Sequence, residues 1–177
     1  MRDEKEHEDI HVSMIDEERV KYVGSLVLGI NDALVELSGA LVGLALTLQN
    51  NKLVGVAGLI TGIAATLSMS ASEYLSQKAE KSGISPLKAA FYTGIAYMLT
   101  VILLTSPYLT LPDYPPALLV MLTIVVLVIL VFTFFISIVK DVSFKRISLE
   151  MLSITLGVTA VSFIIGWFAR TVFNVEV

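Results

Sequence analysis

The chain has 177 residues, 55% of them hydrophobic, and its mean hydropathy is +0.81. These values are far from those of soluble domains and predict an integral membrane protein. The chain has no cysteine, which excludes disulfides and thiolate metal sites, and its net charge of −4 gives no reason to expect a nucleic-acid partner.

Residues 1–21 form an acidic tail, predicted to be cytoplasmic, with an interfacial helix expected from Ser13 onward. His7 and His11 complete a literal HExxH pattern. A zinc protease needs a stable helix, a third ligand and a cleft, and the sequence of this polar tail indicates none of them. A solvated charge run and a loose metal-collecting tail both remain open.

Residues 22–177 are predicted to be a five-helix transmembrane domain, so the fold class is an all-α integral membrane protein. Each helix comes from an apolar stretch of about the length that crosses a bilayer. Residues 106–116 hold four of the chain's five prolines and are expected to form an irregular interfacial loop. The predicted spans are 22–48, 53–75, 86–105, 117–139 and 147–173.

The positive charges predict the orientation of this domain. Of the 12 lysine and arginine residues, only Lys52 and Arg170 lie on the side away from the N-terminus. Cytoplasmic loops carry the excess of positive charge, so the N-terminus is expected in the cytoplasm and the C-terminus outside. We expect a multi-pass protein of the cell membrane.

The first span carries two acidic residues near its middle. Asp32 and Glu36 are four residues apart and therefore share one helix face. Gly29, Gly39 and Gly43 continue the same stripe in a regular α-helix. An ionisable residue inside a membrane marks a functional site, and small residues allow close helix packing. The stripe predicts that the two carboxylates face protein or a cavity and not lipid.

The second span carries a similar stripe that includes Met69 and Glu73, and it is expected to pack on the first span through facing glycines. At a rise of roughly 1.5 Å per residue, Asp32 lies about 16 Å and Met69 about 13 Å from the cytoplasmic edge. The two should therefore lie at nearly one level. Glu150, in the first turn of the fifth span, is expected at the cytoplasmic mouth.

This column of oxygen ligands with one thioether suits a divalent transition metal, because a thioether does not favour hard cations. Carboxylates without a basic partner bind either protons or metal, which is the chemistry of an antiporter. Three structural alternatives remain open. Met69 can be a side chain that only fills the core, and Glu73 can be a structural charge that reaches the membrane interface. Glu150 can be an acid that is stabilised by the helix dipole in a first turn.

Two motifs resemble the vacuolar iron transporter family. The segment GINDALVELSGALVGLA is similar to its first helix, and LSMSASEYLSQKAE is similar to the signature of its second helix. The resemblance covers about residues 18–175. It implies that Asp32 and Met69 match the pore aspartate and methionine and that Glu73 matches the signature glutamate. Glu36 has no assigned counterpart.

The resemblance also implies Fe²⁺ or Mn²⁺ export from the cytoplasm, exchange with protons, and a homodimer with its pore near the two-fold axis. The glycine stripe of the first span is then expected to be both the dimer interface and the pathway. The chain departs from plant-type members because only SQKAEKSGIS stands where they carry a metal-collecting helical insert. It is also too short for the ferritin-like domain of some prokaryotic relatives.

The sequence thus predicts a transporter of Fe²⁺ or Mn²⁺ that carries its metal as substrate and has no resident cofactor. The metal-ligand candidates are Asp32, Glu36, Met69, Glu73 and Glu150. Two alternatives are a proton-coupled carrier of another cation or solute and a non-transporting membrane adaptor. An enzyme is not expected, because no nucleophile–base pair, phosphate loop or cofactor motif is present.

Overall fold

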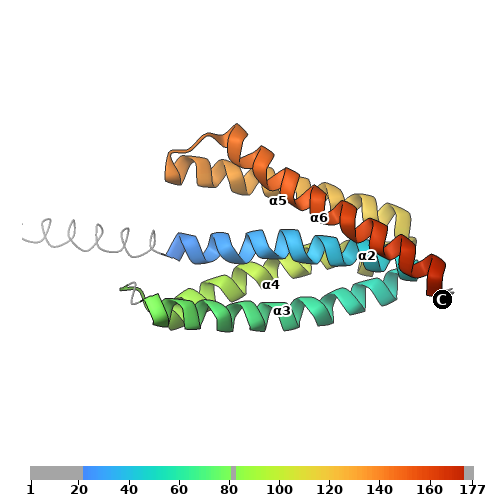
Figure 1. The fold of residues 1–177 in the computed structure, drawn as a ribbon, viewed down its shortest axis with the longest axis horizontal. Helices are drawn as coiled ribbons and strands as arrows, with labels where there is room; N and C mark the ends of the chain where they lie inside the picture. Colours follow the sequence, from blue (N-terminus) through green and yellow to red (C-terminus); the bar gives the residue numbers. More distant parts are fainter. Residues whose placement is uncertain (1–21, 81–82, 174–177) are drawn as a thin grey trace, which may run out of the picture.

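The computed structural model describes residues 22–80 and 83–173, and these form a bundle of five long helices (Figure 1). Each is long and apolar enough to cross a membrane, as predicted. The acidic tail, with its interfacial helix and HExxH pattern, lies outside the described residues. The first span runs over Tyr22–Leu48 and comprises a first segment, the π-helix η1 (Ala33–Leu37) and the helix α2 (Ser38–Leu48). The other four are α3 (Asn51–Glu80), α4 (Pro86–Thr110), α5 (Tyr114–Lys140) and α6 (Phe144–Phe173).

The ends of these helices follow from local chain chemistry. Gln49 takes a left-handed conformation (φ 47°) and ends the first span with its N–H bonded to the carbonyl of Ala45. Pro86 opens α4, because proline needs no N–H partner in a first helical turn. Asp141, also left-handed (φ 50°), ends α5.

Several predicted boundaries were wrong, and the proline-rich stretch shows why. Residues 106–110 belong to α4, and α5 already begins at Tyr114, so only 111–113 are irregular. Pro107 cannot donate to the carbonyl of Leu103, but the Ser106 hydroxyl donates to that oxygen instead (2.8 Å). A serine hydroxyl thus supplies the donor that the proline lacks, and the helix continues.

The second span also differs from the prediction. The helix starts at Asn51 and extends to Glu80, so the polar residues 76–80 are helical and not part of the connection. Likewise, α6 begins at Phe144, which places Glu150 in its second turn. The helix-dipole explanation of Glu150 therefore does not apply.

The prediction that the first two spans pack through facing glycines was wrong. The most extensive contacts of α3 are with α4, and those of α2 are with α6. A Cβ at Gly62 would lie 2.4 Å from a methyl of Val101, and one at Gly55 would lie 2.6 Å from a methyl of Leu109. The α3 glycines are thus notches for large α4 side chains, with Gly58 also contacting Leu41.

The bundle has two distinct ends (Figure 1). The Tyr22 end carries the connection from α3 to α4 and the turn from α5 to α6, and the opposite end carries the two turns 49–50 and 111–113 and the end of α6. This pairing of loops agrees with the predicted five-pass topology. The core between the helices is apolar, and its largest fully buried side chains include Tyr97, Tyr108 and Leu34.

Candidate functional site

A π-helical turn interrupts the first span at its acidic residues. Ala33–Leu37 is π-helical, Asp32 immediately precedes this turn, and Glu36 lies inside it. A π-turn bonds residue i to i+5, which widens the helix by one residue, and such turns are frequent at functional sites. The Ser38 hydroxyl donates to the carbonyl of Leu34 and closes the loosened backbone.

The π-turn also corrects the predicted stripe. Gly29 packs against Thr93 and Ala96 of α4, whereas Gly39 packs against Val158 and Ser162 of α6. One extra residue in a turn rotates everything that follows, so the glycines after the acids face a different neighbour from the one before them. The glycine stripe is therefore used inside the chain, and it is not available as the predicted dimer interface.

Glu36 is fixed by a tyrosine that sequence reasoning missed. The Tyr97 hydroxyl, on α4, donates to Glu36 Oε2 at 3.2 Å. The Tyr97 side chain is 0% exposed, whereas Glu36 lies on the surface of the single chain. The buried Tyr97 hydroxyl thus positions one oxygen atom of Glu36, while the Glu36 side chain stays exposed at the surface of the chain.

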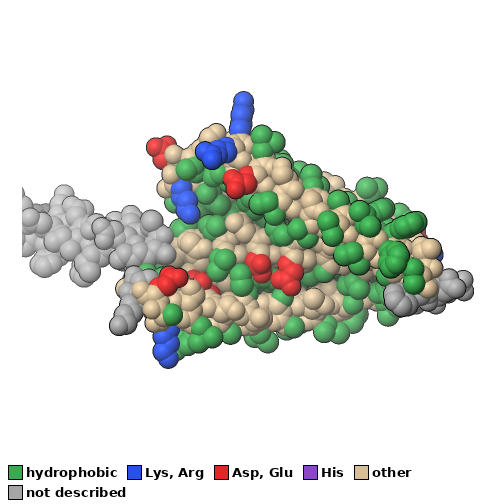
Figure 2. Space-filling model, viewed as in Figure 1, with side chains coloured by type: hydrophobic (Ala, Val, Ile, Leu, Met, Phe, Trp, Pro, Cys, Tyr) green, Lys and Arg blue, Asp and Glu red, His purple; other side chains and the backbone are tan. Residues whose placement is uncertain are grey.

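Asp32 lies next to Glu36 in an open groove. The Asp32 carboxyl is half-buried, and the two carboxyl groups are close enough to interact directly. The groove has a volume of about 390 Å³ and is lined by one face of the first span: Gly24, Val27, Leu28, Asn31, Asp32 and Val35. Figure 2 shows acidic side chains in the middle of the bundle face, away from the basic side chains at its ends.

Asn31 adds an unused acceptor beside this groove. Its side-chain oxygen Oδ1 is buried and has no hydrogen-bond partner among the described residues. Buried polar atoms are nearly always paired, so such an atom calls for a donor or a cation. The position of Asn31 next to Asp32 was the one sequence signal that could have identified it.

Glu73 is more tightly held than its sequence position indicated. It is 5% exposed, and its Oε1 accepts from Ser25 Oγ at 2.7 Å and from Gln77 Nε2 at 3.0 Å. Ser25 comes from the first span, and its own carbonyl accepts from Thr93 at 2.9 Å. Glu73 therefore ties α3 to the first span, and the first span is tied in turn to α4.

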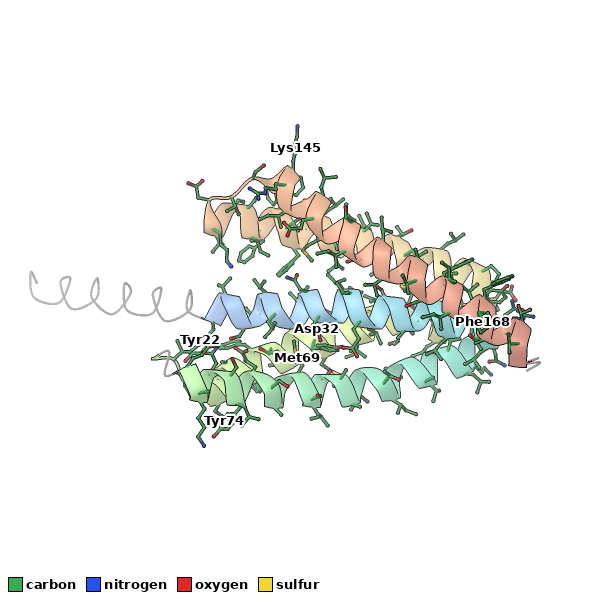
Figure 3. The ribbon with its side chains drawn as sticks, viewed as in Figure 1. Tyr22, Asp32, Met69, Tyr74, Lys145 and Phe168 are labelled. Atoms are coloured by element: carbon green, nitrogen blue, oxygen red, sulfur yellow. The ribbon has the colours of Figure 1, made fainter. Side chains whose placement is uncertain are left out.

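Met69 lies where the depth estimate placed it. Figure 3 shows Asp32 and Met69 at a similar position along the bundle, on the first span and on α3. Met69 is partly buried and packs against the apolar core, which agrees with a filler role. Glu150, by contrast, is exposed on α6.

The predicted ligands do not form one complete site within a single chain. In residues 22–80 and 83–173, no three acidic or histidine side chains come together as a metal-ligand set. The chain instead brings Asp32 and Glu36 together, holds Glu73 in a separate hydrogen-bonded cluster, and leaves Glu150 on the surface. The acidic pair is the part of the predicted column that this single chain assembles.

The fold and this site define the class of the protein. It is a multi-pass helical membrane protein with ionisable groups inside its first span. A comparison with family models then matches residues 23–84 to the VIT family. This match contains both sequence motifs and supports the membership of the chain in the vacuolar iron transporter family, as predicted. Members of that family are transporters rather than enzymes. No curated protein matches the chain.

Proposed function

We propose that the protein moves Fe²⁺ or Mn²⁺ across the membrane, with Asp32 and Glu36 as central ligands. The observation that carries the proposal is the pair of adjacent carboxyl groups at a π-turn within a membrane span that contains no lysine or arginine. A carboxylate costs a few kcal/mol or more at the bilayer centre, so the pair needs a cation or protons to be stable there.

The type of donor favours transition metals over alkaline-earth ions. Carboxylates alone suit Mg²⁺ and Ca²⁺ as well, but the thioether of Met69 at the level of Asp32 adds a softer ligand. Because the same carboxyl groups bind protons when no metal is present, an exchange of metal for protons follows from their chemistry. This is the basis for proposing an antiporter.

A second copy of the chain would complete the site. Octahedral coordination of a divalent ion takes about six ligand atoms, more than the two carboxyl groups of one protomer supply. Glu36 is exposed in the single chain, and a carboxylate that faces lipid at this depth is unfavourable. A two-fold contact along the open groove of the first span would cover Glu36 and bring two acidic pairs together.

The direction of transport rests on the distribution of charge. The bundle end that begins with Tyr22 also carries five basic residues, which supports its assignment as the cytoplasmic end by the positive-inside rule: Lys78, Lys88, Lys140, Lys145 and Arg146. Glu73 lies between this end and the acidic pair. We propose a cell-membrane protein in which the metal enters from the cytoplasm and leaves on the opposite side.

The test is metal uptake into inside-out vesicles that contain the full chain. Asp32→Ala should abolish uptake of Mn²⁺ and Fe²⁺, while the oligomeric state in detergent stays unchanged. Asp141→Asn, an exposed acidic residue at the turn after α5, is the matched control and should transport normally. Uptake by Asp32→Ala at the normal rate would overturn the assignment.

One observation favours a non-transporting adaptor as the second candidate. The glycines of the first span and of α3 are occupied by neighbours in the same chain, so they provide evidence of packing and none of a pathway. Calorimetric titration with Mn²⁺ separates the two functions. A transporter should bind the ion in a way that depends on Asp32, and an adaptor should not.

A further inference from the structure

Glu150 is an acidic residue of α6 for which the single chain provides no partner. It lies six residues into the helix, about 9 Å from its start, and its side chain is exposed. It makes no hydrogen bond or ion pair to another described residue. A carboxylate within a membrane span is unfavourable against lipid and faces protein or water instead. The chain alone therefore leaves this carboxylate without the surroundings that it needs.

The exposed surface of α6 is too polar for a helix that faces lipid on all sides. Over the most apolar stretch of each span, α6 buries 17% of its residues and has a mean hydropathy of 1.9, whereas α5 buries 28% and reaches 3.3. Gly157, two turns after Glu150 on the same face, is exposed, and an added Cβ there would meet no atom within 4 Å. This face of α6 thus leaves room for the close approach of another helix.

Two hydroxyl groups on α3 are also without a partner. Ser68 and Ser72 are four residues apart, share one helix face and are both exposed. Neither hydroxyl makes a hydrogen bond within the described chain. By contrast, Thr66 and Ser70 of the same helix each donate to the carbonyl four residues earlier. The two exposed hydroxyls are therefore donors that remain available to an acceptor from outside the chain.

The carboxylate and the hydroxyls border the open groove of the first span from its two sides. Around α3, Glu73 contacts the first span and separates Ser72 from Ser70, which packs against α4. Around α6, Val158 contacts the first span and separates Glu150 from the α5 side. Both groups therefore lie on the face seen in Figure 1, with α4 and α5 behind. Figure 2 shows acidic side chains over α6 and over the first span on this same face.

The two groups also lie at the same level along the bundle. The first span and α6 run in the same direction, and α6 meets Gly39 two to three turns after Glu150. Asp32 lies two turns before Gly39, so Glu150 is close to the level of Asp32. Met69 of α3 is at this level as well (Figure 3), and Ser72 follows less than one turn later. Glu150 and Ser72 are therefore at nearly the same depth.

We propose that Glu150 accepts a hydrogen bond from the Ser72 hydroxyl of a second copy of the chain, with Ser68 as a neighbouring donor. The inference rests on the two-fold contact along the groove that is proposed above. A two-fold axis parallel to the helices exchanges the two borders of the groove, so α6 of each copy meets α3 of the other. The contact forms twice, and it gives Glu150 a role in assembly and not in metal coordination.

Cross-linking of the full chain in membranes tests this contact. The chain has no cysteine, so two differently tagged copies can carry one each: Glu150→Cys in the first and Ser72→Cys in the second. A short bifunctional thiol reagent should join them into a mixed dimer. Leu149→Cys in place of Glu150→Cys is the matched control, because Leu149 is also exposed but lies on another face of α6. It should give little cross-linked product.

The dissociation constant of the dimer in detergent provides the second measurement. Glu150→Leu removes the acceptor and should raise this constant roughly tenfold or more, since hydrogen bonds to charged groups are the strong ones. Glu150→Gln keeps an acceptor oxygen and should raise it less. If the two side chains act on each other, Ser72→Ala should have little further effect when Glu150→Leu is already present.

The outcomes separate this contact from the proposed pathway. A dimer that forms without cross-linking at these two positions would overturn the contact and leave the two-fold pathway standing, and so would additive effects of Glu150→Leu and Ser72→Ala. A chain that stays monomeric would overturn both. Asp32→Ala addresses the pathway alone, because it should abolish metal uptake and leave the cross-link unchanged.

Discussion

The two halves of the first span differ in how closely neighbouring helices pack against their glycines. Before the π-turn, Gly24 has no neighbouring atom within 4 Å of an added Cβ, and the helix face around Asp32 is an open groove. After the π-turn, Gly43 and Gly166 bring α2 and α6 so close that a Cβ on Gly166 would lie 2.6 Å from the Gly43 carbonyl oxygen. The first half, called the open half, packs on α4 through Gly29 but leaves the face around Asp32 uncovered. The second half, called the packed half, is held against α6 through its glycines.

The largest expected effect belongs to the open half. Asp32→Asn keeps the shape of the side chain and removes its charge, so we expect metal uptake to fall by more than about 100-fold, since outer-shell changes alone typically cost 10–100-fold in metal affinity. Stability should not fall, because an intramembrane charge is removed. Vesicle uptake and thermal unfolding measure the two quantities, with Asp141→Asn at the exposed turn after α5 as control.

The packed half should respond in stability. Gly166→Ala places a methyl group against the backbone of α2, which cannot move aside as a flexible side chain can. Overpacking of this kind costs about 1–3 kcal/mol. Gly24→Ala is the same change where space is free, and it should leave the free energy of unfolding unchanged or raise it by up to about 1 kcal/mol. Equal losses in the two variants would contradict the comparison.

A third prediction concerns the contact that joins the open half to α3. Ser25→Ala removes the 2.7 Å bond to the buried Glu73 carboxylate and should destabilise the bundle by about 1–3 kcal/mol. Ser76→Ala removes an exposed bond to Glu80 and should have no measurable effect. Unfolding in a denaturing detergent series measures both, and a Ser25→Ala variant as stable as Ser76→Ala would count against the buried cluster.

The smallest effect is expected at Tyr97. Tyr97→Phe keeps the buried ring and removes the hydrogen bond that positions Glu36, so the apparent affinity for Mn²⁺ should weaken by roughly tenfold. If Tyr97 acts through Glu36, the substitution should have little further effect when Glu36→Gln is already present. Additive losses in this double-mutant cycle would instead indicate a purely structural role for the tyrosine.

The sequence was a good guide to the spans and to the level of Asp32 and Met69, because the length of an apolar stretch and the helix rise depend only on local chemistry. It failed at the π-turn. A π-turn cannot be recognised from the spacing of residues in the sequence. It nevertheless changes the direction in which the following residues point, and Gly39 packs against α6. Hydrogen bonds such as those from Tyr97 and Ser25 depend on how distant helices pack, which spacing does not encode.

The crossing of α2 and α6 at Gly43 and Gly166 has a mechanical consequence. From this point α6 and α5 diverge from the first span toward the Tyr22 end (Figure 1). Glu150 lies roughly 16 residues, or about 24 Å, along α6 from the crossing. A relative rotation of about 10° there would displace Glu150 by about 4 Å while the two glycines barely move. Any relative rotation of the two helices at this contact would therefore be amplified along α6 toward Glu150.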